Sequence, residues 1–145
     1  MLTVVAGVLA VMCLGGGVTG YLLYDRITTP DRSSPTVVVD SYLRAFLVDH
    51  NDVRADLFTC DGDTDLDQLR LLRSDLAARE ERFGTSMSIS WGNVLAEEAG
   101  NRAEVRVELL LSARVDGVRQ YDRQSWTFTT QLAEEWRVCS GVMDG

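Results

Sequence analysis

The sequence predicts an α+β protein: an N-terminal transmembrane helix followed by a cone of three helices packed on a curved, four-stranded antiparallel sheet. Three observations predict it. Residues 2–24 are apolar and carry no charge. Apolar residues then recur at helical spacing up to residue 83, and from residue 86 they alternate at every second position. Helices followed by consecutive strands indicate an α+β order rather than βαβ units.

The uncharged segment is long enough to cross a bilayer. At 1.5 Å per residue, a helix over residues 2–24 would measure roughly 34 Å, against a hydrocarbon core of about 30 Å. Tyr21 and Tyr24 precede Asp25, as interfacial tyrosines do at the end of a span. We therefore expect residues 1–24 to anchor the chain by a single pass. The competing interpretation is a cleaved signal peptide, which the lack of a basic region before the apolar run disfavours.

The end of the apolar segment contains a pattern that favours association of two membrane helices. Gly16 and Gly20 form a G-x-x-x-G pair, a spacing that lets two membrane helices approach closely, so weak self-association is expected. Residues 25–34 are interpreted as a linker, and the first proline of the chain, Pro30, lies within it. The remaining residues, 35–145, form one domain.

Two features point to opposite sides of the membrane for this domain. Arg26 and Arg32 follow the apolar segment, and positive charge favours the cytoplasmic side. Two aspartates accompany them, however, and the domain contains a pair of cysteines, which favours an oxidising compartment. We expect the domain to lie on the extracytoplasmic side of the cytoplasmic membrane.

The charge balance excludes one class of partner. The 145 residues include 14 basic residues, all of them arginine, and 22 acidic residues, which gives a net charge of −8. Binding to nucleic acid requires basic residues gathered on one face, and the sequence contains no basic cluster. We expect no nucleic-acid partner.

Two helices are expected before residue 61. The first begins at Ser34-Pro35, a hydroxyl cap followed by a proline in the first turn, and ends near Asp49. Its apolar face is formed by Val38, Val39, Tyr42, Leu43, Phe46 and Leu47. The second covers residues 53–60 and is expected to bury Val53, Leu57 and Phe58.

A third, longer helix follows an acidic turn. Thr64-x-x-Asp67 is similar to a capping box, with aspartate in place of glutamate, and Gly84 is a typical helix end. The residues expected to face the core are Leu66, Leu69, Leu72, Leu76 and Phe83.

Four strands are expected after residue 86, over residues 87–91, 102–115, 118–132 and 136–139. Asp116-Gly117 is a strong signal for a two-residue hairpin turn. Such a turn fixes a register in which Leu111 faces Asp122 and Leu109 faces Gln124.

The terminal W-R-V-C motif, Trp136–Cys139, completes a known order of elements. A valine-rich first helix, a short second helix ending in cysteine, a long third helix and long strands precede it. This order resembles the nuclear transport factor 2-like superfamily, also called cystatin-like or ketosteroid-isomerase-like. More narrowly, it is similar to small membrane-anchored members found outside the actinobacterial cytoplasmic membrane. The resemblance covers residues 35–142 and implies a cone that holds ligands between sheet and helices.

Cys60 and Cys139 are the only cysteines of the domain. They are either two buried thiols or a disulfide, and an even pair behind an export-type helix favours the disulfide. His50 is the only histidine, expected at a solvated helix end, so neither a zinc site nor a cofactor is expected. The alternating acids Asp61, Asp63, Asp65 and Asp67 lack the glycine and glutamate of a calcium loop.

The candidate pocket consists of residues expected on the inner face of the cone, namely Gln120, Asp122, Gln124 and Tyr42. A carboxyl group beside leucines has a raised pKa and can serve as a base. A one-residue bulge would instead turn Asp122 outward and Tyr121 and Arg123 inward. No catalytic residue is assigned.

The expected function is that of a non-enzymatic, membrane-anchored extracytoplasmic accessory domain that recognises an envelope protein or a small apolar ligand. The alternative is an isomerase- or cyclase-like enzyme that uses Asp122. A cone filled by Trp91, Trp126 and Trp136 would exclude the enzyme.

Overall fold

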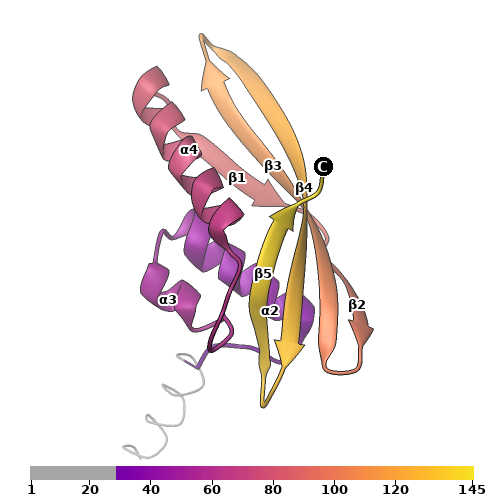
Figure 1. The fold of residues 1–145 in the computed structure, drawn as a ribbon. Helices are drawn as coiled ribbons and strands as arrows, with labels where there is room; N and C mark the ends of the chain where they lie inside the picture. Colours follow the sequence, from indigo (N-terminus) through magenta and orange to yellow (C-terminus); the bar gives the residue numbers. More distant parts are fainter. Residues whose placement is uncertain (1–28) are drawn as a thin grey trace, which may run out of the picture. The chain divides into compact units, whose positions relative to one another are not determined.

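A computed structural model describes residues 29–145, of which Asp31–Gly145 form one compact unit (Figure 1). The transmembrane helix expected over residues 2–24, its glycine pair and Cys13 lie outside the described residues. Within residues 29–145, every helix is too short or too polar to cross a membrane.

The first helix forms where its cap predicts. α2 (Pro35–Leu43) begins after Ser34, whose hydroxyl accepts a hydrogen bond from the Val37 N–H at 3.2 Å. The chain continues as the π-helical turn η1 (Arg44–Val48). It then reverses at His50, whose φ of 51° is in the left-handed region that non-glycine residues rarely adopt.

The second and third helices differ in part from the prediction. α3 covers only Asp52–Asp56, with Asn51 accepting from the Arg54 N–H at 3.0 Å. α4 covers Asp67–Phe83 and ends at Gly84 with a φ of 59°, as predicted, but no side chain caps its start, so the expected capping box is wrong.

Three apolar side chains expected in the core are exposed instead. Val53 is 80% exposed and Leu57 46%, because α3 is too short to bury a full helical face. Phe83 is 58% exposed, because the last turns of α4 extend past the core.

The sheet has five strands, not four (Figure 1). Their bounds are β1 Met87–Trp91, β2 Leu95–Ala99, β3 Arg102–Val115, β4 Val118–Leu132 and β5 Trp136–Met143. The sheet order is β1-β3-β4-β5, and the additional strand β2 pairs with β3 beyond β1. The sequence of β2, LAEEA, lacks β-branched residues and a clear alternation, so tertiary pairing rather than propensity makes it a strand.

The predicted register of the long hairpin is confirmed. Asp116 and Gly117 have φ of 51° and 78°, as the two-residue turn requires. Leu111 pairs with Asp122 and Leu109 with Gln124, without a bulge between β3 and β4. A shift of register occurs instead on the other side of β4, where β4 pairs with β5, between Thr129 and Thr130.

The helices lie on one side of the curved sheet, with α2 and α3 beside its lower half and α4 beside its upper half (Figure 1). Trp126, Phe128 and Trp136 are buried against the apolar face of α2 and η1. Trp91 packs at the edge of this core and donates its indole N–H to Asp40 at 2.7 Å. The part of the cone beneath α2 is therefore filled by side chains.

Cys60 and Cys139 form a disulfide, with their Cα atoms 5.0 Å apart. The Cys60 N–H donates to the Val138 carbonyl and the Asp65 N–H to the Cys139 carbonyl, both at 2.9 Å. Residues 59–65 thus run alongside β5 and cover its outer edge, and the disulfide holds them there.

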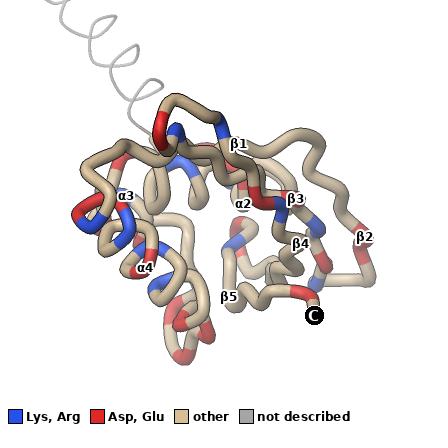
Figure 2. The backbone as a smooth tube through the Cα atoms, turned by 90° about the horizontal axis from the view of Figure 1, so that it is seen from above, with Lys and Arg blue, Asp and Glu red and all other residues tan. Residues whose placement is uncertain are grey.

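Charges of both signs are mixed over the surface. Figure 2 shows arginines beside acidic residues along α3, α4 and β3. Several form exposed pairs, among them Asp75–Arg79 at 2.9 Å and Glu108–Arg123 at 3.7 Å. These pairs are exposed to solvent, and such pairs contribute little to stability.

Candidate functional site

The structure does not bring the four predicted pocket residues together. Gln120 and Asp122 lie on the predicted face of β4 but are exposed, and Gln124 is half-buried. Tyr42 is buried on the helical side of the domain and lines a separate hollow. The expected arrangement of an acid enclosed among leucines is therefore not present, because α4 borders this part of the sheet but leaves Asp122 exposed.

Two of these β4 side chains and a neighbouring tryptophan form a hydrogen-bonded row. The Trp126 indole N–H donates to Gln124 Oε1 at 3.2 Å, and Gln124 Nε2 donates to Asp122 Oδ2 at 3.0 Å. Gln124 is thereby oriented by a buried tryptophan, and it presents its amide to the Asp122 carboxylate.

This row lies in a groove between α4 and β4, which we call the α4–β4 groove. Two hollows make it up. One, of about 360 Å³, is lined by Gln68, Leu71, Leu72, Asp75, Gln124, Trp126 and Met143. The other, of about 150 Å³, is lined by Arg79, Phe83, Thr85, Met87, Leu111, Ala113, Val115, Gln120, Tyr121 and Asp122. The Asp75–Arg79 ion pair on α4 and the Asp122–Gln124 hydrogen bond on β4 connect the two.

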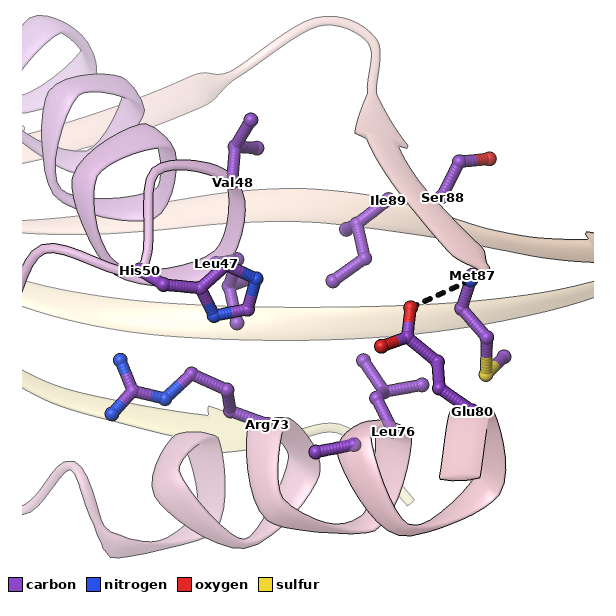
Figure 3. Close-up of a pocket in the computed structure, with 10 residues that line it drawn as sticks. Leu47, Val48, His50, Arg73, Leu76, Glu80, Met87, Ser88 and Ile89 are labelled. Carbon is purple, nitrogen blue, oxygen red and sulfur yellow. Dashed lines mark hydrogen bonds between the residues drawn. The ribbon is translucent and has the colours of Figure 1, made fainter. Parts of the chain in front are cut away.

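A separate hollow of about 280 Å³ lies on the other side of α4 (Figure 3). Leu47, Leu76 and Ile89 form its apolar lining, while His50 and Glu80 lie at opposite ends. The Glu80 carboxylate accepts the Met87 N–H at 2.7 Å. Glu80 thus connects α4 to the start of β1.

Arg73 also reaches this hollow, but its guanidinium is already occupied. It makes two hydrogen bonds to the Asp52 carboxylate, at 2.6 and 3.2 Å, and lies 4.0 Å from the centre of the Phe46 ring. The hydrogen bonds from Arg73 hold the pKa of Asp52 below its usual value. Arg73 therefore serves mainly to join α4 to η1 and α3.

Tyr42 lies in a polar hollow of about 460 Å³ between α2, α3 and α4. Its ring stacks on Phe46 with centroids 5.6 Å apart. Burial raises the pKa of the Tyr42 hydroxyl well above its usual value, so the phenol is neutral at physiological pH.

Among residues 29–145, no group of three or more His, Cys, Asp or Glu residues is placed to hold a metal ion. The sequence did not predict the α4–β4 groove or the contact of Glu80 with β1. The available signal for the groove was Leu71, an apolar residue of α4 outside the predicted core face, which is exposed.

Comparisons with known proteins identify the fold. No protein-family model and no curated protein matches the chain. An NTF2-like protein with a cystatin-like fold from Novosphingobium aromaticivorans is similar in structure, with 14% identity and a TM-score of 0.54 over 86% of this chain and 84% of that one. Aln2 from a Streptomyces species has 13% identity and a TM-score of 0.53 over 79% of this chain and 93% of that one.

A third solved structure, Rv3472 from Mycobacterium tuberculosis, is described as a protein of unknown function. It has 16% identity and a TM-score of 0.50 over 74% of this chain and 66% of that one. At such identities the likeness concerns the fold, and function has to be argued from the site. The order of elements, the curved sheet and these neighbours together show that the chain has the cystatin-like fold of the nuclear transport factor 2-like superfamily.

Proposed function

We propose that the protein is a non-enzymatic accessory domain, anchored in the cytoplasmic membrane and displayed on its outer side, where it binds an envelope protein or a small apolar ligand. The observation that carries this proposal is the α4–β4 groove. Its lining is mainly apolar, and its charged residues, Asp75, Arg79 and Asp122, are all exposed. Such a groove suits recognition of an apolar group at the surface.

The environment of Asp122 argues against catalysis in this groove. A catalytic carboxyl group is usually desolvated, so that its proton affinity suits the reaction. Asp122 lies on the exposed half of β4, and its hydrogen-bond partner is the neutral amide of Gln124. The filled part of the cone, under α2, contains Trp126 and Phe128 where a reaction chamber would have to be.

The disulfide supports the outer location. Disulfides persist in secreted and extracytoplasmic proteins and are rare in the reducing cytosol. The uncharged residues 2–24 supply a segment of the right length for the anchor.

One observation favours an isomerase- or cyclase-like enzyme as the second candidate. His50 has a strained backbone, and it faces Glu80 across the apolar hollow beside α4 (Figure 3). Glu80, however, already accepts the Met87 N–H, which gives it a structural role.

Protease accessibility tests the proposal. The full chain, tagged after Gly145, is expressed in bacteria, and spheroplasts are treated with proteinase K. We expect the tag to be lost without lysis, while the untreated protein sediments with membranes. A variant lacking residues 1–28 is the control and should be protected inside the cell. A tag on the full chain that is digested only after lysis would contradict the outer location.

A further inference from the structure

We infer that the α4–β4 groove binds an extended peptide segment of a partner protein, which pairs with the open edge of β4 and places apolar side chains against α4. The inference rests on the proposed function and names the chemistry of its partner. Three observations carry it: an unpaired strand edge, an adjacent apolar wall and an acid without a basic partner.

β4 has strand partners on both sides over only half of its length. It pairs with β3 from Val118 to Leu132, but with β5 only from Trp126 onward. The Ser125 carbonyl accepts the Asp144 N–H at 2.8 Å, just beyond the end of β5. Along Val118–Gln124, β3 is the only strand partner of β4 within residues 29–145. Such an edge can accept another strand, as in β-strand addition.

The groove beside this edge exposes large apolar side chains from α4 and from the end of β5. Nine large apolar side chains are exposed among the described residues, and three of them line the groove with their side chains. They are Leu71 at 69% exposed, Phe83 at 58% and Met143 at 49%. Exposed apolar side chains gathered around a groove can mark a binding surface, whereas single exposed apolar residues need no explanation.

The open edge of β4 and the stretch of α4 beside the groove are each long enough to contact an extended peptide of about seven residues. The open edge from Val118 to Gln124 would pair with a strand of about seven residues, which spans roughly 23 Å. The α4 wall from Gln68 to Phe83 measures roughly 22 Å at 1.5 Å per residue. A compact small molecule would fill one hollow and leave the other, together with the strand edge, uncovered.

The charges indicate a basic residue in the partner. Asp75 and Arg79 neutralise each other across 2.9 Å. Asp122 forms no ion pair with the described residues, and its partner is the Gln124 amide. A lysine or arginine of the peptide on the groove side can therefore pair with Asp122, and the net charge of −8 would assist the approach of a basic segment.

The probe is a blocked, fluorescently labelled heptapeptide, LTLTKTL, which alternates groove-facing leucine or lysine with threonine. Binding to the full chain in nanodiscs is measured by fluorescence anisotropy, and the bound site by hydrogen–deuterium exchange. We expect saturable binding with new protection of the amides over residues 118–124. The peptide LPLPKPL should not bind comparably, because proline cannot donate the N–H bonds of a strand.

Substitutions then assign the contacts. Phe83→Ser should weaken binding about tenfold through loss of apolar burial, and Asp122→Asn about two- to fivefold through loss of an exposed ion pair. Leu95→Ser is the matched control, since Leu95 is 65% exposed on β2, and should bind as the unmodified protein does.

Three results would overturn the inference: no saturable binding of LTLTKTL, equal binding of the proline peptide, or protection of β1 rather than β4. If a fluorescent fatty acid bound in the groove where the peptide did not, the inference would fail while the proposed binding function stood. The outer location is judged separately by protease accessibility, so the two failures are distinguishable.

Discussion

Replacing both Cys60 and Cys139 with alanine is expected to lower the free energy of unfolding by about 4–5 kcal/mol. The disulfide closes a loop with a sequence separation of 79 residues, and in the chain-entropy model such a loop restricts the unfolded chain by that amount. It also holds residues 59–65 against the edge of β5. Urea unfolding of the full chain in detergent, followed by far-UV circular dichroism, measures the change.

Reduction provides the control for this prediction. The unmodified protein in excess reductant should become nearly as unstable as the double variant, and reductant should leave the double variant unchanged. A loss below about 1 kcal/mol in both cases would show that the disulfide does not constrain the unfolded chain as the structure implies.

Trp126→Ala is expected to cost about 3–5 kcal/mol, the usual range for removing a buried tryptophan. Trp126 is 2% exposed and its ring lies 6.3 Å from that of Phe128, at the centre of the core. The substitution also removes the indole N–H that orients Gln124. Thermal and urea unfolding should both show the loss.

The matched control is Ser125→Ala, at the neighbouring and exposed position of the same strand. It should change stability by no more than about 0.5 kcal/mol. If Trp126→Ala also changed stability by no more than about 0.5 kcal/mol, Trp126 would not fill the cone as described. The cone could then hold an open chamber beside β4.

The parts of the fold set by local chemistry could be predicted from sequence. Asp116-Gly117 determines the hairpin turn, and the turn determines the β3–β4 register, so the face of Asp122 was predicted correctly. Ser34 and Gly84 mark helix ends for equally local reasons.

The parts set by tertiary contacts could not be predicted. β2 becomes a strand by pairing with β3, although its sequence has low strand propensity. Phe83 is exposed because the last turns of α4 extend past the core. The environment of Asp122 depends on how closely α4 packs on the β3–β4 hairpin, which the alternation of residues along β4 does not encode. The open edge of β4 likewise follows from where β5 ends against it.

We propose a disulfide-closed domain that is displayed outside the membrane behind an intact anchor. Counting thiols tests it most directly: the full chain is taken from intact cells, denatured without reduction and labelled with a maleimide. We expect one reactive thiol per chain, that of Cys13, and three after reduction. Three reactive thiols before reduction would contradict the disulfide and the outer location, and none would show that the anchor had been removed.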